Sequence, residues 1–438
     1  MKQKEWLIYK KIIEYSKDGE VMKILEIVGG NELTGTIRIS GAKNSSVALI
    51  PAAILSDEEV TICNVPEISD TDNLCDILNY LDVETKRASE SIVINPEHMQ
   101  NIEIKESFSK KLRASYYFMG ALLGKYKKAV MYFPGGCSIG ARPIDLHLKG
   151  FEALGATVKS EGNKYTVEAE ELHGANIYLD IASVGATINI MLAAVKANGK
   201  TIIDNAAKEP EIVNVATFLN NMGAKITGAG TSTIKIEGVK HLHKCFHEVI
   251  PDRIEAGTYI IIGALCGNNL KIDNIIPKHI ESLLLKLKEI GVNLKVGSDY
   301  VIVSKNEHYS PTNIKTLVYP GFPTDLQQPL TVLLTQCNGK SKVMETIWEN
   351  RFMHIPYLVQ MGADITVKNQ TATIIGPTKL TGTEVVATDL RAGAAMVAAA
   401  LTATGKTMIT NVEHILRGYE NIVEKLTLVG AKIKSREI

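Results

Sequence analysis

The chain has 438 residues, of which 45% are hydrophobic, and its 48 Lys and Arg balance its 48 Asp and Glu. This length is sufficient for two domains, each with its own core. Balanced charge excludes a general basic field that would attract nucleic acid or a membrane surface. The longest apolar run, Ala392 to Ala403, is too short and too rich in alanine to span a bilayer. We expect a cytoplasmic protein of enzyme size.

The first 21 residues stand apart from the rest of the chain. They mix Lys, Glu and Asp with apolar residues, without a long apolar core or a small-residue cleavage site, so they do not resemble a secretory signal. Met22 stands just before the first expected strand. Residues 1–21 are therefore either an added helix or a result of the choice of start site, and their role stays open.

A short turn of the form apolar-Gly-small recurs between expected helices and strands. A degenerate first copy lies at Leu81-Asp82, and successive copies begin 68 to 74 residues apart. Such spacing is typical of a chain built from repeated supersecondary units. The complete copies contain Gly155, Gly223, Gly291, Gly362 and Gly430.

One unit illustrates the elements that each repeat predicts. A helix over 186–197 is followed by a strand over 199–204, a helix over 210–222 and two strands over 224–226 and 232–236. Gly223 fits the C-terminal stop of the second helix. We interpret the chain as an α/β protein with six βαβαββ-like units in two domains of three.

The expected boundaries follow from the repeats. The first strand, near Leu25 to Ser40, precedes the first unit and is expected to pair with the C-terminal half. The chain would then cross between domains near Gly41–Asn44 and near Pro251, where ligand sites are common. We predict an extension over 1–21, one domain over 22–43 plus 251–438, and a second domain over 44–250.

The segment Pro134–Pro143 places Cys137 in a glycine-rich loop, five residues before Arg142. Glycines allow the backbone to come close to a ligand. A thiol near a guanidinium can have a lowered pKa and take part in proton transfer or nucleophilic chemistry. The alternative is a tight surface turn with an inert cysteine.

The other five cysteines show no disulfide-like spacing and are expected to be reduced. His241, His243, Cys245 and His247 alternate, so they would share one face of a strand. Such a set could bind zinc, but ligands on one flat strand do not converge readily to a tetrahedral site. We therefore expect no metal.

Six cations stand at unusual places along the repeats, most of them at expected helix N-termini, where anions are favoured. Common nucleotide-binding loops are missing from the sequence. Each cation alone is explained by a surface position or a salt bridge. Together, at equivalent repeat positions, they favour a polyanionic substrate; they are Lys43, Arg113, Arg142, Arg351, Arg391 and Arg417.

Six motifs follow one another along the chain, namely Ser40–Asn44, Pro134–Leu146, Pro251–Glu255, Pro320–Asp325, Glu349–His354 and Arg417–Glu420. Through these motifs, from about Met22 onward, the chain resembles the UDP-N-acetylglucosamine 1-carboxyvinyltransferases of the EPSP synthase superfamily, in which the motifs have the same order. The resemblance implies two inside-out α/β barrels built from six βαβαββ units. It implies transfer of the enolpyruvyl group of phosphoenolpyruvate to the 3′-hydroxyl of UDP-N-acetylglucosamine, with release of phosphate, the committed step of peptidoglycan synthesis. No cofactor, metal, nucleic acid or membrane is implied.

The resemblance also implies roles for single residues. Asp325 would take the proton of the sugar hydroxyl, although its position also suits a helix N-cap. Cys137 would protonate C3 of phosphoenolpyruvate or assist product release, and would be alkylated by fosfomycin-like epoxides. The implied catalytic residues are Lys43, Cys137, Asp325 and Arg417.

The implied ligand contacts form two sets. Phosphoenolpyruvate would be bound through its phosphate by Lys43, Arg142 and Arg417, through its carboxylate by Arg351 and Arg391, and by Asn44. UDP-N-acetylglucosamine would be bound by Asn44, Arg113, Arg142, Pro143, Ile144, Asp145, Leu146, Ser183, Val184, Gly185, Asp325 and Ile347.

Two positions depart from the family pattern. Tyr319 stands where some members have histidine, and Ile181 where some have a basic residue near the diphosphate. Three alternatives remain: a shikimate 3-phosphate enzyme of the same architecture, a catalytically silent sensor of UDP-N-acetylglucosamine, and an RNA cyclase of similar repeats. Cys137 argues against the first, the complete set of charged residues against the second, and the balanced charge against the third.

Overall fold

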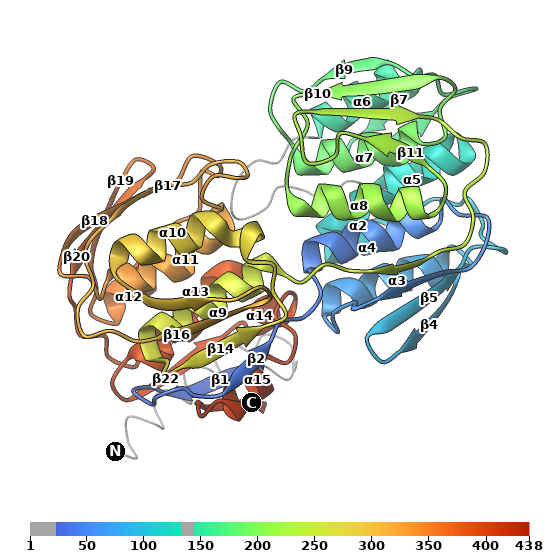
Figure 1. Cartoon of the computed structure of the whole chain (residues 1–438). Helices are drawn as coiled ribbons and strands as arrows, with labels where there is room; N and C mark the ends of the chain where they lie inside the picture. The colour runs from blue at the N-terminus through green and yellow to red at the C-terminus, as the bar shows by residue number, and fades with distance from the viewer. Residues whose placement is uncertain (1–22, 133–143, 438) are drawn as a thin grey trace.

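A computed structural model describes residues 23–132 and 144–437 of the chain. Two lobes are visible (Figure 1). The first lobe holds the elements from α2 (Lys43–Ala53) to β13 (Phe246–Glu248). The second lobe holds β1 (Lys23–Val28), β2 (Thr36–Arg38) and the elements from α9 (Arg253–Cys266) to β23 (Lys432–Glu437).

The first lobe contains three separate open sheets and a set of helices within the described residues. In spatial order, its sheets are β13–β3 (Val60–Cys63)–β5 (Ser91–Asn95)–β4 (Glu84–Ala88), β11 (Lys225–Thr227)–β12 (Thr233–Glu237)–β10 (Lys200–Asp204)–β9 (Asn176–Tyr178), and β6 (Lys128–Tyr132)–β8 (Lys164–Glu168)–β7 (Thr157–Glu161). Its helices are α2, α3 (Ser69–Tyr80), α4 (Glu106–Lys111), η1 (Arg113–Tyr116), α5 (Tyr117–Tyr126), α6 (Asp145–Ala153), α7 (Val184–Ala194) and α8 (Pro210–Asn221).

The second lobe repeats this organisation with three more open sheets. They are β21 (Glu384–Val386)–β22 (Lys406–Thr410)–β1–β23, β15 (Asn293–Val296)–β16 (Tyr300–Ser304)–β14 (Leu270–Asp273)–β2, and β17 (Asn313–Lys315)–β18 (Gly339–Met344)–β20 (Thr371–Gly376)–β19 (Asp364–Lys368). Its helices are α9, η2 (Pro277–Ile280), α10 (Glu281–Ile290), α11 (Thr324–Leu334), α12 (Ile355–Gln360), α13 (Leu390–Thr402), α14 (Glu413–Leu416) and α15 (Ile422–Leu428).

Three helices form the centre of each lobe. In the second lobe, α9, α11 and α13 pack against one another, and every residue of α9 after Arg253 is buried. In the first lobe, α5 packs against both α2 and α7. Helices that are apolar on all sides must be buried, whereas strands such as β12 and β16 alternate between buried and more exposed residues. The α/β class is therefore confirmed.

The repeated glycine turns take the conformation that requires glycine. Their φ angles are 96°, 101°, 91°, 106° and 103° at Gly155, Gly223, Gly291, Gly362 and Gly430, and Asp82 of the degenerate copy has φ of 58°. The predicted helix over 186–197 runs instead from Val184 to Ala194, and the one over 210–222 ends at Asn221. The predicted order of elements in this unit is confirmed.

The predicted first strand is in fact two strands in two sheets. Gly30 and Gly35 have φ of 77° and 116°, so the chain turns between β1 and β2. The predicted pairing with the C-terminal half is confirmed, because β1 pairs with β22 and β23, and β2 pairs with β14.

The two chain crossings lie side by side, since Gly41 forms a β-bridge with Pro251. A Cβ atom at Gly41 would lie 1.6 Å from the Asn64 carbonyl oxygen, so only glycine fits there. Two separate hydrophobic clusters surround these crossings. One joins Leu25–Ile39 to residues 254–433, and the other spans 42–249. No described helix is long and apolar enough to cross a membrane.

Candidate active site

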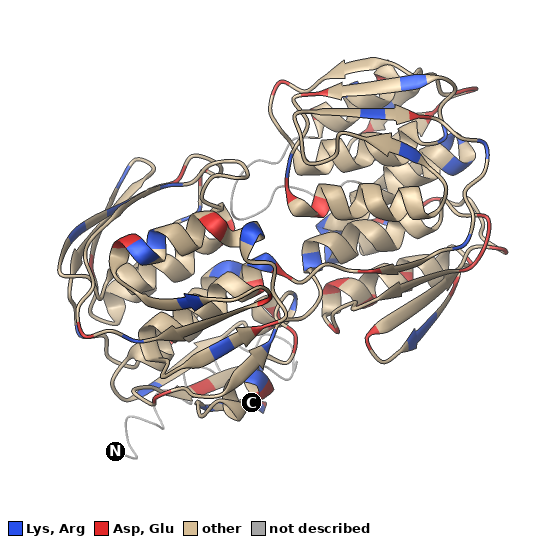
Figure 2. Cartoon of the chain, in the orientation of Figure 1, with Lys and Arg blue, Asp and Glu red and all other residues tan. Residues whose placement is uncertain are grey.

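Three of the predicted site residues, Cys137, Arg142 and Pro143, lie outside the described residues. Most of the others fall into three groups, which lie around Asp70, Asp325 and His147. Figure 2 shows Lys, Arg, Asp and Glu together where the two lobes face one another. Asn44 is the half-buried second residue of α2, next to Lys43.

Lys43 and Arg417 meet on Asp70, a carboxylate that the sequence analysis did not select. The Lys43 Nζ atom lies 2.9 Å from Asp70 Oδ2, and Arg417 Nε donates to Asp70 Oδ1 at 2.9 Å. Burial acts to raise the pKa of Asp70, but the charges of Lys43 and Arg417 outweigh it and lower this pKa. An ionised carboxylate of the first lobe therefore holds a cation from each lobe.

Arg351 and Arg391 meet on Asp325 in the second lobe. Arg351 Nη2 lies 2.5 Å from Asp325 Oδ1, and Arg391 Nε donates to Asp325 Oδ2 at 3.2 Å. Both arginine side chains are 3% exposed. Burial alone would lower the pKa of Arg391, but nearby Tyr419 and Asp325 raise it. Arg351 Nε and Arg391 Nη1 have no hydrogen-bond acceptor within the described residues, so the pair can bind a further anion.

Two helix-capping aspartates fix the elements that carry these cations. Asp252 caps α9, and its Oδ2 accepts the backbone N–H of Lys43 at 2.9 Å. Asp389 caps α13, and its Oδ1 accepts the backbone N–H of Arg391 at 2.8 Å. The guanidinium of Arg391 also lies 5.4 Å from the ring centre of Tyr419, two residues after Arg417. These contacts bring the Asp70 and Asp325 groups close to one another.

The predicted helix-terminus positions are correct only in part. Lys43 begins α2, Arg113 begins η1, and Arg391 is the second residue of α13. Arg417 instead follows the last residue of α14, and Arg351 precedes α12 by a turn. Asp325 is the second residue of α11 rather than its N-cap, which is Pro323. Its carboxylate therefore pairs with Arg351 and Arg391 instead of capping the helix.

The described residues predicted to bind the uridine diphosphate group come together in the first lobe. Ser183 caps α7, and Gly185 follows in its first turn. A Cβ atom at Gly185 would lie 2.9 Å from Tyr116 Oη and 3.0 Å from His147 Cε1. Ile144, Asp145 and Leu146 form the start of α6, just before His147.

His147 is a buried centre of this group that the sequence analysis missed. Its Nδ1 lies 2.8 Å from Asn189 Nδ2, and Tyr116 packs against its ring. Burial and the charge of Arg113 lower the pKa of His147 to about 3, so its ring is neutral. Neutral His147 accepts from Asn189 at Nδ1 and carries its proton on Nε2.

Among the residues predicted to bind UDP-N-acetylglucosamine, Ile347 lies apart from the His147 group, in the second lobe. It is half-buried just after β18, and its backbone N–H donates to Glu345 at 2.8 Å. Of the departures from the family pattern, Ile181 is 68% exposed, and Tyr319 lies under the guanidinium of Arg253 at 5.6 Å.

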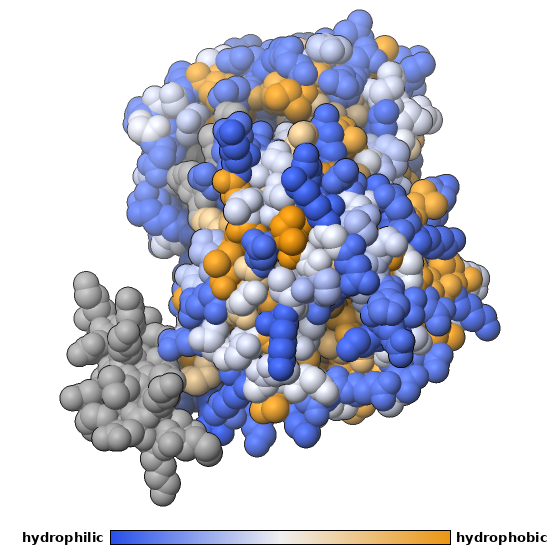
Figure 3. Space-filling model, turned by 90° about the vertical axis from the view of Figure 1, so that its left-hand side faces the viewer, coloured by the Kyte–Doolittle hydropathy of each residue, from blue (hydrophilic) through white to orange (hydrophobic). Residues whose placement is uncertain are grey.

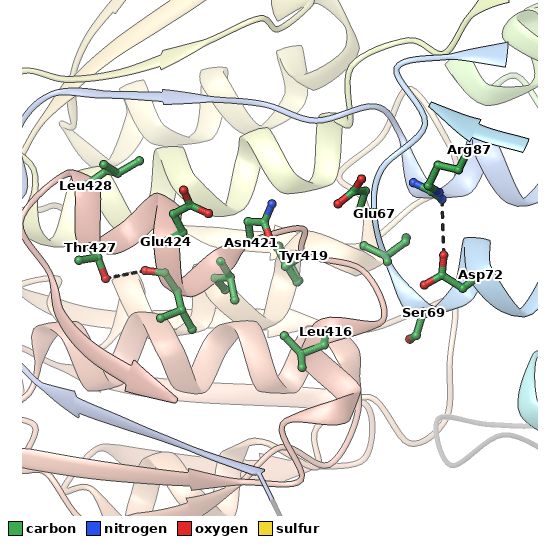
Figure 4. A pocket seen from close by; sticks show the side chains of 13 residues that line it. Glu67, Ser69, Asp72, Arg87, Leu416, Tyr419, Asn421, Glu424, Thr427 and Leu428 are labelled. Atoms are coloured by element: carbon green, nitrogen blue, oxygen red, sulfur yellow. Dashed lines mark hydrogen bonds and ion pairs between the residues drawn. The ribbon is translucent and has the colours of Figure 1, made fainter. Parts of the chain in front are cut away.

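A cavity of about 860 Å³ adjoins the Asp70 group without containing it (Figure 4). Its walls include Ser69 and Asp72 of α3, and Leu416 and Tyr419 on either side of Arg417. None of the predicted substrate-binding residues lines it. We therefore place the chemistry at the charged groups rather than in this cavity.

The histidine and cysteine segment has structural contacts. Within residues 23–132 and 144–437, no three His, Cys, Asp or Glu side chains are grouped to hold a metal ion. His247 is hydrogen-bonded to Asn214 at 2.9 Å and to Asn221 at 3.1 Å. Burial lowers its pKa to about 4, so His247 is neutral.

Comparison with known proteins gives concordant results. The family described as EPSP synthase (3-phosphoshikimate 1-carboxyvinyltransferase) matches residues 27–426. UDP-N-acetylglucosamine 1-carboxyvinyltransferase 2 of Geobacillus kaustophilus is 55% identical, over 94% of this chain and 96% of the relative. The protein of the same name from Listeria monocytogenes is 54% identical, over 93% of this chain and 97% of its own length.

Two solved structures are similar to the chain. The enolpyruvyl transferase NikO from Streptomyces tendae matches with a TM-score of 0.87 and 27% identity, covering 96% of this chain and 100% of that chain. EPSP synthase from Acinetobacter baumannii matches with a TM-score of 0.73 and 17% identity, covering 94% and 100% respectively. The second likeness concerns the fold alone.

Proposed function

The chain belongs to the EPSP synthase family and, within it, to the UDP-N-acetylglucosamine 1-carboxyvinyltransferases, and we propose that it carries out their reaction. It is a transferase that moves the enolpyruvyl group of phosphoenolpyruvate to the 3′-hydroxyl of UDP-N-acetylglucosamine and releases phosphate in peptidoglycan synthesis. The observation that carries this proposal is the pairing of two cations on each of two carboxylates. A substrate with one phosphate and one carboxylate fits the two cationic pairs.

Binding of phosphoenolpyruvate exchanges these internal ion pairs for contacts with the substrate. The phosphate takes contacts from Lys43 and Arg417, which Asp70 holds in place. The carboxylate takes contacts from Arg351 and Arg391, whose Nε and Nη1 atoms, respectively, have no acceptor within the described residues. After this exchange the carboxylate of Asp325 can accept a proton from the sugar hydroxyl.

The reaction then proceeds by addition and elimination. Asp325 takes the proton of the sugar hydroxyl, whose oxygen attacks C2 as C3 is protonated, with Cys137 as the proposed acid. The surrounding cations stabilise the charge that develops on the substrate. Phosphate leaves from C2 and a proton leaves C3, which restores the double bond. Cys137 and Arg142 enter this proposal from the family resemblance, since both lie outside the described residues.

The finer architecture is part of the same proposal. We assign 22–43 plus 251–438 to one inside-out α/β barrel and 44–250 to another, each of three βαβαββ units. The two hydrophobic clusters, the three central helices of each lobe and the repeated turns support this assignment. We place the enzyme in the cytoplasm, where its substrates would be, and propose Cys137 as a target of fosfomycin.

The alternatives make different demands on the same residues. A shikimate 3-phosphate enzyme would have no use for the group around His147 as a nucleotide site. A silent sensor would have no use for Asp325 between two buried arginines. Relatives at 54–55% identity are named UDP-N-acetylglucosamine 1-carboxyvinyltransferase, which favours the proposed reaction over both the shikimate 3-phosphate enzyme and the silent sensor.

The test is phosphate release from phosphoenolpyruvate with UDP-N-acetylglucosamine or shikimate 3-phosphate as acceptor. We expect release only with the nucleotide sugar, and a fall of at least about 100-fold in Asp325→Ala. Release only with shikimate 3-phosphate would move the chain to the sister activity. Tight nucleotide-sugar binding without any release would favour the sensor.

A further inference from the structure

Glu345 is a buried carboxylate behind the Asp325 group, and its environment differs from that of a surface acid. It directly follows β18, and its exposed fraction is 0%. The ion pairs of the described residues do not include it. Instead, four donors surround its carboxylate, namely Thr316 Oγ1 at 2.8 Å, Thr324 Oγ1 at 2.9 Å, the Ile347 N–H at 2.8 Å and the Trp348 N–H at 3.3 Å.

The two carboxylate oxygens serve different parts of the site. Oε2 accepts from Thr324, the first residue of α11, and Asp325 is the second. Oε1 accepts from Thr316 and from the backbone of Ile347 and Trp348. One side chain therefore fixes the start of the helix that carries Asp325 and the loop that carries Ile347.

The internal repeats show which residue follows the corresponding strand in other units. In four other units, the residue after the corresponding strand is asparagine: Asn64 follows β3, Asn205 follows β10, Asn274 follows β14 and Asn411 follows β22. Each of these strands, like β18, pairs in parallel with a three-residue strand. All four asparagines have positive φ, between 53° and 59°.

Asparagine at this position ties the strand end to its neighbour. The side-chain amides of Asn64, Asn205 and Asn274 donate to the carbonyls of Val249, Leu179 and Ile39. In the β18 unit, Thr346 performs this task instead, since its N–H donates to Thr316 Oγ1 at 2.9 Å and its hydroxyl to the Thr316 carbonyl at 2.5 Å. Glu345 is therefore not needed to connect the two strands, and its carboxylate binds Thr324 and the backbone of Ile347.

Burying a carboxylate is costly, and only its four hydrogen bonds compensate it here. A neutral asparagine at the same strand end avoids that cost in the other units. We propose that Glu345 is a positioning residue, which aligns the Ile347 loop for the sugar nucleotide and Asp325 for proton transfer. This inference rests on the proposed function, because Ile347 and Asp325 take their roles from it.

The decisive variant is Glu345→Asn, which introduces the residue that four other units already accept at this position. We expect its KM for UDP-N-acetylglucosamine to rise about tenfold and kcat to fall about tenfold, with KM for phosphoenolpyruvate changed less than about twofold. Thr324→Val removes only the hydrogen bond from Thr324 Oγ1 to Glu345, next to Asp325. It should lower kcat and leave both KM values within about twofold. Asp364→Asn, at an exposed acid at the start of β19 in the same sheet, is the matched control and should behave as wild type.

Several outcomes decide the matter. Wild-type kinetics in Glu345→Asn would overturn the proposal, as would equal losses in the affinity for both substrates. If Glu345→Asn does not fold, Thr324→Val decides, and an unchanged kcat there would overturn it. Calorimetric measurement of UDP-N-acetylglucosamine binding without phosphoenolpyruvate separates a failure of the Glu345 inference from a failure of the proposed function. Weaker binding by Glu345→Asn supports the inference even if the wild type shows no turnover, which would instead contradict the proposed function.

Discussion

Asp70 Oδ1 lies 2.9 Å from Arg417 Nε, so a carboxylate of the first lobe holds an arginine of the second lobe across 347 residues of sequence. Lys43, at the crossing between the lobes, binds the other oxygen of the same carboxylate. The proposed binding site for the phosphate group and the junction between the lobes therefore share one ion-paired centre. We therefore expect a change at Asp70 to affect both stability and the proposed binding of the substrate.

We expect Asp70→Asn to lower the free energy of unfolding by about 1 kcal/mol at pH 7, because two charge-assisted hydrogen bonds are weakened, one of them to the partly exposed and therefore screened Arg417. The pKa of Asp70 is lowered in the folded protein, so its contribution is present above about pH 4 and is lost as the pH falls through the folded value. Thermal unfolding of wild type and variant at pH 7 and at pH 3 measures this, and the difference should shrink at pH 3. Asp72→Asn, at an exposed carboxylate two residues away, is the control.

Glu255 should give the opposite dependence on pH. It is buried, with Oε1 2.7 Å from Lys425 Nζ and the Ser40 N–H donating to Oε2. Burial, only partly offset by Lys425, raises the pKa of Glu255 to about 7. Its stabilising contribution is complete below the unfolded value of about 4.3 and is lost as the pH rises to about 7. Glu255→Gln should therefore gain stability relative to wild type between pH 5 and pH 8, by up to about 3 kcal/mol. If the melting temperatures of wild type and Glu255→Gln change by the same amount between pH 5 and pH 8, this assignment is contradicted.

The sequence predicted the repeats better than the contacts between them. The glycine turns are visible because positive φ restricts the residue type, and all five glycines take it. The asparagines that end four strands follow the same logic and were overlooked. The single strand expected over 25–40 was wrong because Gly30 and Gly35 turn the chain between two sheets.

For the site, the cations were identifiable but their partners were not. Asp252 and Asp389 stand directly before helices, which is a local capping signal that could have selected them. Asp70 and His147 carry no such signal, because their roles depend on residues brought close by the fold. Surface hydropathy adds little, since hydrophobic and hydrophilic residues are interspersed on the face seen in Figure 3.

Arg391→Lys tests whether the buried arginine pair binds the carboxylate of phosphoenolpyruvate. Arg391 donates through Nε to Asp325, while its Nη1 lacks an acceptor in the described structure. A lysine has a single ammonium nitrogen and cannot replace both of these nitrogen donors in the same geometry. We expect KM for phosphoenolpyruvate to rise at least about tenfold, with KM for the sugar nucleotide within about twofold. Steady-state kinetics with each substrate varied in turn gives both values. Arg436→Lys, at an exposed arginine of β23, should leave them unchanged.

Gly185→Ala tests the nucleotide group in the first lobe. The added Cβ would lie 2.9 Å from Tyr116 Oη and 3.0 Å from His147 Cε1, so one of these rings must move. We expect KM for UDP-N-acetylglucosamine to rise about tenfold without a change in KM for phosphoenolpyruvate. Adding Tyr116→Phe removes the nearest oxygen and should restore part of the loss. An equal rise in both KM values would show a general disturbance of the fold instead.

The sensitivity of the enzyme to fosfomycin-like epoxides should depend on Cys137 alone. Burial raises the pKa of Cys75, Cys245 and Cys266 to about 11 and that of Cys337 to about 12, so these thiols stay protonated and unreactive at neutral pH. Cys63 is half-buried and accepts a hydrogen bond from Ser91. Mass spectrometry after treatment should therefore show one adduct, on the peptide that contains Cys137.

Cys137→Asp separates alkylation from catalysis, because aspartate can still donate a proton but cannot open the epoxide as a thiolate does. We expect this variant to retain turnover within about tenfold of wild type and to resist inactivation completely. Cys63→Ser is the matched control and should stay sensitive. Inactivation of Cys137→Asp at the wild-type rate would place the reactive group elsewhere. Loss of all turnover in Cys137→Asp would instead assign the thiol a role in catalysis that a carboxylic acid cannot fill.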